Sequence, residues 1–488
     1  MLSRRATLTT SLAAAALPSA VAASPPTRRP NIVLVVIDDM RHDEYGAGGH
    51  AFLKTPHIDA LAARGLDFRQ AHVATPLCSP NRASILTGQY ASRHGVTDNV
   101  DRSVLSRRLR NVAQQLQAGG YETAHIGKWH LGNDARPRPG YDHWISFEGQ
   151  GRILDPPIFE NGRLAPVKGY ITDILTGRAV DFIRRPHERP FFLYLGHKAV
   201  HPDAIQRADA SIDVEYGTRF IAAERYAGRY AGLPITRPAA ALRAAESLAG
   251  KPVLRRALEF RATPEITGRF APILDPGTSD ETIRTRAEMM LSVDESVGAL
   301  VAALRQTGQL DDTLVLFTSD NGYFFGEHGL SIERRLPYTP CARVPLIASW
   351  PGRTEPGRSD ALVQSIDIAP TLLDAAGLGP DPEMQGLSIT PLFRRPGVRL
   401  RDALLIEYVG EELPQPWTVD LGYKALRTRR HSFIHWLHFP REPELYDLEA
   451  DPDEIVNVAA SSAYRGVLNR MRARLREMEP ATLGLQRS

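Results

Sequence analysis

Three short segments of the chain consist almost wholly of apolar residues, many of them β-branched. They span residues 31–37, 191–196 and 313–319. An unbroken apolar run of this length is typical of a strand that is buried on both faces of a sheet. Segments with helical spacing of apolar residues, such as 112–118 and 282–304, lie between these strands. The alternation predicts an α/β domain with a mostly parallel sheet.

The rest of the chain departs from this alternation in two places. Residues 203–275 are rich in Ala and Arg with scattered Pro and Gly, and we expect them to form a long insertion over one end of the sheet. We predict a main domain over 30–395 and a smaller C-terminal unit over 396–488. The smaller unit has apolar strand patterns at 403–408 and 432–437 and then a terminal helix.

The N-terminus has the features of an export signal. Arg4 and Arg5 precede a short run of small apolar residues, and an Ala-Val-Ala sequence follows at 20–22. This order predicts a twin-arginine signal peptide over residues 1–22 and a periplasmic or secreted protein. The apolar run is too short and too rich in Ala to span a bilayer. The alternative is an ordinary frayed N-terminus.

Composition and charge exclude several classes of protein. The 488 residues include 59 Lys and Arg against 56 Asp and Glu, and 43% are hydrophobic. This profile excludes an intrinsically disordered chain, a collagen and a coiled coil. The basic residues are interleaved with acidic ones, so no positive field predicts nucleic acid as a partner.

The chain has two cysteines, Cys78 and Cys341. In an exported protein a single disulfide between them is one expectation. A chain of this size does not need such a crosslink, however. Cys78 stands at the start of a helical pattern that closes at Gly88, and Arg82 lies one turn further on. A thiol at a helix N-terminus beside an Arg is placed to react.

Two acidic doublets follow two of the predicted strands. Asp38 and Asp39 end the first strand, and Asp320 and Asn321 end the third. Ligands of such sheets lie beyond the carboxyl ends of the strands, and carboxylates that converge there repel one another unless a cation joins them. An all-oxygen set of this kind suits calcium or magnesium. The alternative is that each doublet is only a turn or a helix cap.

Lys128, His130 and His197 add cationic and proton-carrying groups. Lys128 and His130 are alternate residues, so on an extended segment both side chains point to the same side. His197 directly follows the second strand. Together with a cation and the helix N-terminus at Cys78, these residues predict a pocket for an anionic tetrahedral group, either sulfate or phosphate.

At this point the sequence resembles a known family. The stretch from Cys78 to Gly88 is similar to the signature of type I sulfatases, in which the cysteine is oxidised to Cα-formylglycine. The resemblance extends over nearly the whole mature chain. It includes Asp38-Asp39, Gly127-Lys128-Trp129-His130, Ser319-Asp320-Asn321-Gly322, Arg343-Val344-Pro345-Leu346 and Glu444-Leu445-Tyr446-Asp447-Leu448.

The resemblance implies an alkaline-phosphatase-like α/β fold, with a large mixed sheet between helices and a smaller C-terminal α+β unit. It implies one calcium ion, with magnesium as the second choice. It also implies a nucleophilic formylglycine hydrate at Cys78, made by a formylglycine-generating enzyme. The implied roles are metal binding by Asp38, Asp39, Cys78, Asp320 and Asn321, general acid for His197, general base for His130, and positioning of hydrate and sulfate by Arg82 and Lys128.

The sequence departs from the family pattern after Gly326-Glu327-His328-Gly329-Leu330. Many sulfatases carry a lysine there, and this chain has Arg334 and Arg335. We align Arg334 with the lysine, but Arg335 is an alternative. Arg retains the charge, yet it cannot donate a proton as a lysine does.

The segments around His197 and Leu330 look most like bacterial relatives of N-acetylglucosamine-6-sulfatases, which favours a sulfated sugar as substrate. His201, Lys198 and Glu327 are candidate sugar contacts, and Trp417 and His438 are candidates to close the pocket. Two alternatives stay open. One is a phosphate or phosphonate monoester hydrolase of the same superfamily. The other is a non-catalytic binder of sulfated glycans with Cys78 unmodified or paired to Cys341.

Overall fold

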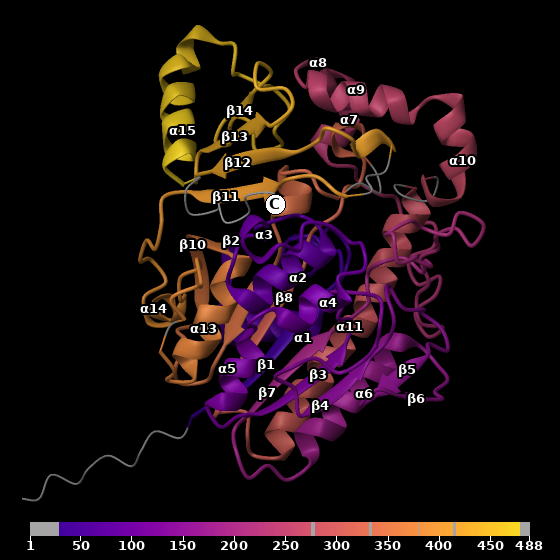
Figure 1. The fold of residues 1–488 in the computed structure, drawn as a ribbon, viewed down its shortest axis with the longest axis vertical. Coiled ribbons are helices and arrows are strands. Elements are labelled where there is room, and N and C mark those ends of the chain that lie inside the picture. Colours follow the sequence, from indigo (N-terminus) through magenta and orange to yellow (C-terminus); the bar gives the residue numbers. More distant parts are fainter. Residues whose placement is uncertain (1–28, 275–278, 331–333, 380, 413–415, 479–488) are drawn as a thin grey trace, which may run out of the picture.

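The computed structural model describes most of the chain (Figure 1). The described residues are 29–274, 279–330, 334–379, 381–412 and 416–478. The predicted signal peptide over residues 1–22 lies outside them. None of the helices in these ranges is long and apolar enough to cross a membrane.

A ten-stranded mixed sheet forms the centre of the molecule. Its strand order is β10-β2-β9-β8-β1-β7-β3-β4-β5-β6. In chain order the strands are β1 (Asn31–Ile37), β2 (Leu66–His72), β3 (Glu122–Gly127), β4 (His143–Ser146), β5 (Ile158–Glu160), β6 (Arg163–Ala165), β7 (Phe191–Gly196), β8 (Thr313–Ser319), β9 (Leu346–Ser349) and β10 (Gly357–Gln364). Strands β8, β1, β7, β3 and β4 are neighbours and run parallel. The predicted α/β fold with a mostly parallel sheet is confirmed.

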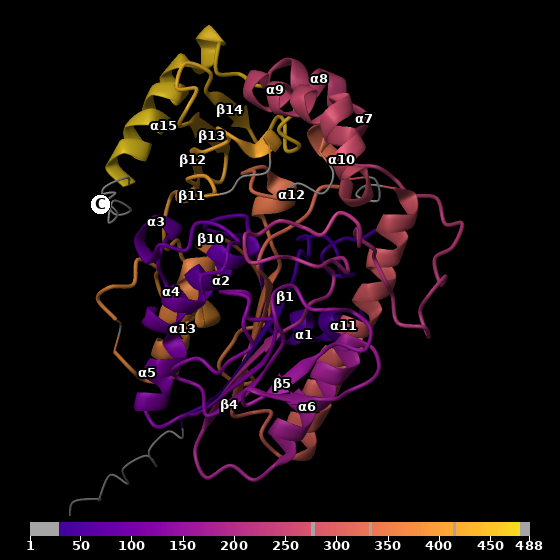
Figure 2. The same ribbon diagram turned by 45° about the vertical axis from the view of Figure 1, so that its right-hand side comes forward.

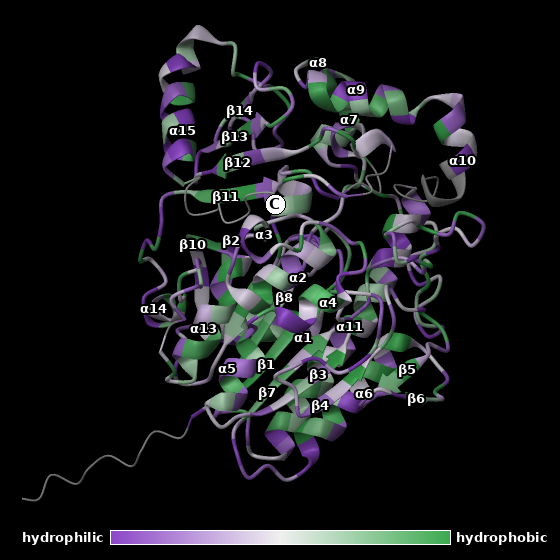
Figure 3. Cartoon of the chain, viewed as in Figure 1, coloured by the Kyte–Doolittle hydropathy of each residue, from purple (hydrophilic) through white to green (hydrophobic). Residues whose placement is uncertain are grey.

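Helices cover both faces of this sheet because β1 is apolar at every position from Ile32 to Ile37. Val33, Val35 and Ile37 face one layer of helices, while Ile32 and Leu34 face the other. The first layer contains α1 (Pro56–Arg64), α6 (Ile171–Arg184) and α11 (Asp280–Gln306), and the second contains α2 (Cys78–Thr87), α5 (Val112–Ala118) and α13 (Ile368–Ala375). Colouring by hydropathy shows the apolar strands between these layers (Figure 3).

Local sequence signals set the ends of several helices. Asn111 and Gln114 form a capping box that starts α5. Helix α2 ends at Gly88, whose φ of 67° lies in the left-handed region that glycine adopts without strain. The predicted helices over 112–118 and 282–304 are thus confirmed as α5 and α11. The shorter helices are α3 (Ala91–His94), α4 (Ser103–Arg108), α12 (Thr339–Ala342), α14 (Thr390–Arg394), η2 (Glu327–Gly329) and η3 (Ser365–Asp367).

A second, antiparallel sheet lies beyond the carboxyl ends of the large one. It contains β11 (Leu404–Tyr408), β12 (Tyr423–Arg427), β13 (His431–Trp436) and β14 (Glu444–Asp447), accompanied by η4 (Pro416–Thr418), η5 (Ser462–Tyr464) and α15 (Arg465–Met478). The expected insertion supplies α7 (Ala239–Leu242), α8 (Ala244–Ala249), α9 (Pro252–Arg261) and α10 (Pro264–Leu274). Figure 2 shows α7, α8 and α9 beside this small sheet, and Lys251 joins the two by donating to the carbonyl of Glu454 at 2.6 Å.

Candidate active site

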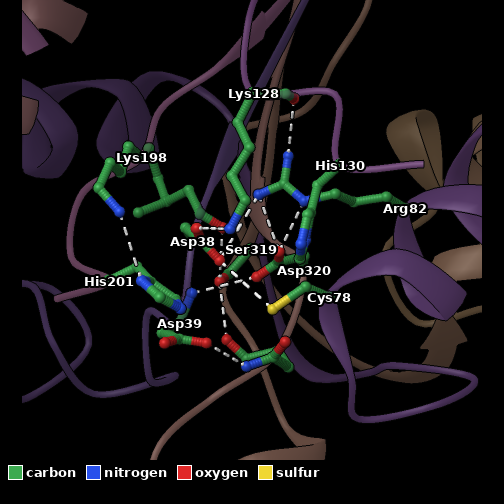
Figure 4. Close-up of polar contacts among 12 residues, drawn as sticks. Asp38, Asp39, Cys78, Arg82, Lys128, His130, Lys198, His201, Ser319 and Asp320 are labelled. Carbon is green, nitrogen blue, oxygen red and sulfur yellow. Dashed lines mark hydrogen bonds and ion pairs between the residues drawn. The ribbon is translucent and has the colours of Figure 1, made fainter. Parts of the chain in front are cut away.

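The predicted site residues, with the exception of His197, meet at the carboxyl edge of the large sheet. Strands β1 and β8 pair in parallel register up to Ile37 and Ser319, so the residues that follow, Asp38 and Asp320, are adjacent. Strand β3 delivers Lys128 to the same edge, because Lys128 N donates to the carbonyl of Gly196 at the end of β7. Figure 4 shows these side chains directed toward a common centre together with Cys78 at the start of α2.

The residues at this centre could hold a metal ion. Asp38, Asp39 and Cys78 each offer a ligand atom, and these atoms all lie within 4.8 Å of one another. The side-chain oxygen Oδ1 of Asn321 is buried and has no hydrogen-bond partner among the described residues, while its Nδ2 donates to Asp39 at 2.7 Å. A buried carbonyl oxygen with no donor is costly unless a cation binds it. The donor set is therefore consistent with a hard divalent cation.

Cationic side chains contact the same carboxylates. Lys128 Nζ contacts Asp38, and Arg82 Nε donates to Asp320 at 2.8 Å. Burial opposes ionisation of Asp38, but Lys128 and Arg82 hold its pKa well below the usual range. Burial raises the pKa of Asp320 to about 7, with Arg82 opposing and Asp38 adding to the rise. Asp38 and Asp320 are thus close enough to disfavour each other's ionisation, as the sequence predicted.

Arg334, rather than Arg335, reaches this cluster. Its guanidinium contacts Asp39, with Nε donating to Oδ1 at 2.6 Å. Burial disfavours the charge, yet Asp39 raises the pKa of Arg334 well above its ordinary value. Arg335 instead pairs with Glu411 at 2.8 Å. Of the two arginines, Arg334 is therefore the one whose side chain contacts the carboxylate cluster.

Cys78 is the first residue of α2, and only 1% of it is exposed. Its Sγ lies 3.7 Å from Asp38 Oδ1. Burial, reinforced by the charges of Asp38 and Asp320, raises the pKa of the thiol well above its usual value. Lys128 acts in the opposite sense and lowers this pKa. Cys78 and Cys341 are both free, so the alternative of a disulfide between them is not supported.

The side chains of Lys128 and His130 lie in the same cluster, as predicted, although the segment is not an extended strand at His130 (Figure 4). Both are buried, and His130 adopts a φ of 56°. This left-handed conformation is uncommon for a residue with a side chain. The carbonyl of His130 accepts a hydrogen bond from Ser79, which ties the Lys128 loop to the first turn of α2. The two segments of the family signature are therefore held together directly.

His197 does not reach the carboxylate cluster. Its Nε2 lies 2.9 Å from Ser296 Oγ on α11, within the helical layer. Burial lowers its pKa to about 4, and the one charged neighbour that acts on it is Asp173, which is remote from the cluster. The predicted role of His197 as general acid needs correction, because its side chain faces the helices rather than the strand ends.

His201 and Lys198 occupy the place expected for His197. Figure 4 shows the His201 ring directed toward Asp38 and Asp39. Burial and then Lys128 hold the pKa of His201 well below its usual value, with Asp38 acting in the opposite sense. The Lys198 ammonium lies 3.5 Å from His201 Nδ1 and donates to the carbonyl of Pro202 at 2.9 Å. Burial and Lys128 also lower the pKa of Lys198 to about 7.

The other residues singled out from the sequence lie elsewhere. Glu327 is held by Arg41 at 2.7 Å and by the backbone N–H of Phe325 at 2.5 Å, so it is committed to the fold. Trp417 is buried and lines a groove with α9. His438 is exposed on the small sheet, 3.6 Å from Asp420. These positions do not support a sugar contact for Glu327 or closure of the pocket by the other two.

Sequence reasoning missed two residues at this site, Gln150 and Gln206. Gln150 accepts a hydrogen bond from Lys128 Nζ at 2.5 Å, and Gln206 lies 2.7 Å from His130 Nε2. Neither glutamine stands in a motif, and neither directly follows a strand of the central sheet. Only the tertiary structure brings them to the site.

Comparison with known proteins places this geometry in a family. Residues 30–378 match the family model for sulfatases, and residues 326–481 match the model for the C-terminal region of N-sulphoglucosamine sulphohydrolase. The chain is 29% identical to an N-acetylglucosamine-6-O-sulfatase of Bacteroides thetaiotaomicron, over 90% of this chain and 84% of the relative. It is 28% identical to the human N-acetylglucosamine-6-sulfatase, over 89% and 81% of the two chains.

A solved structure, bound to its substrate D-glucosamine-2-N,6-O-disulfate, superposes with a TM-score of 0.76 at 28% identity, over 93% of this chain and 98% of the other. The first family match alone covers well over half of the sequence. The fold, the strand-end cluster and these matches agree, and the chain belongs to the sulfatase family.

Proposed function

We propose that this sulfatase removes a sulfate ester from a sulfated sugar, with N-acetylglucosamine 6-sulfate as the first candidate. The observation that carries the proposal is the buried cluster of Asp38, Asp39 and Cys78 at the strand ends, surrounded by Lys128 and Arg82. With a cation bound to the carboxylates, such a cluster suits an anionic tetrahedral group. The choice of sugar rests on the names of the two relatives and on the ligand of the solved structure.

The proposed chemistry needs a calcium ion and a formylglycine at position 78. Asp38, Asp39, Asp320 and Asn321 would hold the ion, which would neutralise the charge of the carboxylates and of the sulfate. A formylglycine hydrate supplies the hydroxyl that attacks sulfur. Magnesium and an unmodified cysteine are the alternatives that metal analysis and mass spectrometry distinguish.

The side chains around the cluster divide the remaining tasks. Lys128 and Arg334 present positive charge to the sulfate oxygens, while Arg82 holds Asp320 in place. His130 is placed to take a proton on the side of Cys78. His201, with Lys198 beside it, is placed to donate a proton to the departing sugar oxygen.

Replacing His201 with alanine is expected to lower kcat on a sugar sulfate by about 100-fold or more, as loss of a general acid does. A sugar alcohol is a poor leaving group and needs the proton. The loss should therefore be much smaller on 4-nitrophenyl sulfate, whose phenolate leaves unaided. Sulfate release from both substrates is measured by ion chromatography.

The matched control is His197→Ala, which removes an equally buried histidine that is bonded to Ser296. It should lower stability by about 1 kcal/mol through the lost hydrogen bond, without distinguishing the two substrates. Equal sensitivity of both substrates to His201→Ala would instead argue against a general acid at this position.

The substrate is tested by incubating the calcium-loaded, modified protein with a panel of sulfated monosaccharides and following free sulfate. Release from N-acetylglucosamine 6-sulfate in preference to its 3-sulfate supports the proposal. Release of sulfate from other sugars only would mean that the substrate is a different sulfated sugar. Cleavage of phosphate monoesters without any sulfate release would overturn the proposed activity.

We also propose that the protein is exported by the twin-arginine route to the periplasm or beyond, with oxidation of Cys78 by a formylglycine-generating enzyme before folding. The proposal rests on the sequence of residues 1–22. Peptide mass spectrometry of the tryptic segment 70–82 from the cytoplasm should find the aldehyde already formed. Unmodified cysteine there, with aldehyde outside the cell, would contradict this order.

A further inference from the structure

We propose that Gln206, oriented by Gln150, is a positioning residue that fixes His130 in one tautomer. In this tautomer Nε2 carries the proton, and Nδ1 is the nitrogen free to accept one. The inference rests on the proposed role of His130 as the base of the sulfatase reaction. It adds a chain of hydrogen bonds that joins the carboxylate cluster to the insertion.

The chain begins at Lys128, which can only donate hydrogen bonds. Its ammonium contacts Asp38 on one side and Gln150 on the other, at 2.5 Å from the amide oxygen Oε1. Because the oxygen of Gln150 faces Lys128, the amide nitrogen faces the opposite way. Gln150 is buried, with 4% of its surface exposed, so water does not compete for the hydrogen bonds that fix this orientation.

The orientation of Gln206 follows from that of Gln150. The Nε2 of Gln150 donates to Oε1 of Gln206 at 3.0 Å. The Nε2 of Gln206 donates to the carbonyl of Ala210 at 3.2 Å. Both contacts require the amide oxygen of Gln206, and not its nitrogen, to face the centre of the site.

His130 is the last member of the chain. Its Nε2 lies 2.7 Å from the same oxygen of Gln206. An amide oxygen only accepts, so Nε2 must carry the hydrogen. The other ring nitrogen, Nδ1, is buried and has no hydrogen-bond partner among the described residues. Figure 4 shows the ring in the cluster that contains Cys78, where a base is needed.

The backbone around Gln206 explains how an insertion residue is held accurately. Residues 205–213 form a small hairpin, in which Arg207 N donates to Ser211 O at 2.9 Å and Asp213 N donates to Ile205 O at 2.9 Å. Asp203 anchors its base by accepting from Ile153 N at 2.9 Å. The hairpin is therefore attached to the same loop region that carries Gln150, and the two glutamines are positioned together.

The test uses the modified, calcium-loaded full-length protein and the sugar sulfate that it cleaves best. Gln206→Met keeps the length of the side chain but removes the amide oxygen, so His130 is free to adopt either tautomer. We expect kcat to fall by about 10- to 100-fold, as when a hydrogen-bond partner of an active histidine is removed. KM should stay unchanged, since Gln206 acts through His130 and not on the substrate.

Two further variants separate this role from a structural one. Gln206→Glu keeps acceptor oxygens for His130 and Gln150 and should restore most of kcat. Combining Gln206→Met with His130→Ala should cause no loss beyond that of His130→Ala alone, because the two residues act as one unit. Arg207→Ala, which removes the exposed ion pair with Asp213 in the same hairpin, should leave activity unchanged.

Each result decides between the alternatives. Native activity in Gln206→Met overturns the inference. It is also overturned if Gln206→Met lowers kcat by the same factor in the native protein and in the His130→Ala protein. A Gln206→Glu protein as slow as Gln206→Met overturns it as well. Absence of sulfate release from the native protein would instead reject the proposed function itself, before any variant is compared. Thermal melting of each variant shows whether it is folded.

Discussion

Replacement of Cys78 with alanine is expected to abolish sulfate release, lowering kcat by at least about 1000-fold. Cys78 is the one described side chain that combines a position at the N-terminus of α2 with contact to the Asp38 carboxylate. Alanine cannot be converted to the aldehyde, and a methyl group offers no attacking oxygen. The measurement is sulfate release over hours by ion chromatography, together with peptide mass spectrometry of segment 70–82.

Cys341→Ala is the matched control for this experiment. Cys341 is equally buried, and its Sγ lies 3.9 Å from the carbonyl of Gly322. The substitution should cost about 1 kcal/mol of stability through the small cavity that it leaves and should keep the activity. A Cys78→Ala protein with native turnover would remove the nucleophile from the proposed mechanism.

Chelation of calcium is expected to produce the second large loss of activity, and calcium added back should restore it. Asp39→Asn should imitate the chelated state, because it removes a charge from the ligand cluster while keeping the size of the side chain. Calcium at 100 times its dissociation constant stabilises a single-site protein by about 2.7 kcal/mol, so the native melting temperature should rise on addition of calcium. The Asp39→Asn protein should lack this rise.

Asp67→Asn provides the comparison for a buried carboxylate outside the site. Asp67 accepts from Tyr45 at 3.0 Å and pairs with Arg69 at 3.0 Å. This variant should lose stability but keep both the rise in melting temperature and the sulfatase activity. A native protein that keeps full activity after exhaustive chelation, with no metal found by elemental analysis, would contradict the calcium site.

Local patterns predicted the residues whose position depends on nearby sequence. The apolar run at 31–37 is a strand because only a doubly buried strand accommodates it, and the acids that follow must then lie at the strand end. Cys78 begins a helix that ends at Gly88 for reasons contained within eleven residues. The positions of the proposed metal ligands and of the proposed nucleophile were therefore foreseeable from the sequence.

The distinction between His197 and His201 was not foreseeable in the same way. Both follow β7 within five residues, and both are buried. Which one faces the carboxylates depends on the turn after the strand and on the helix that packs behind it, where Ser296 accepts or donates to His197. A pattern along the chain contains no information about that helix.

The sequence by itself determined the fold class, the strand-end carboxylates, the cysteine and the two basic residues Lys128 and His130. These features follow from burial periodicity and from motifs in which neighbouring residues act together. The tertiary structure alone decided that Arg334 reaches Asp39, that His201 and not His197 faces the carboxylates, and that Gln150 and Gln206 link Lys128 to His130. Those contacts join segments far apart in the chain, and their selection depends on packing between layers rather than on local preference.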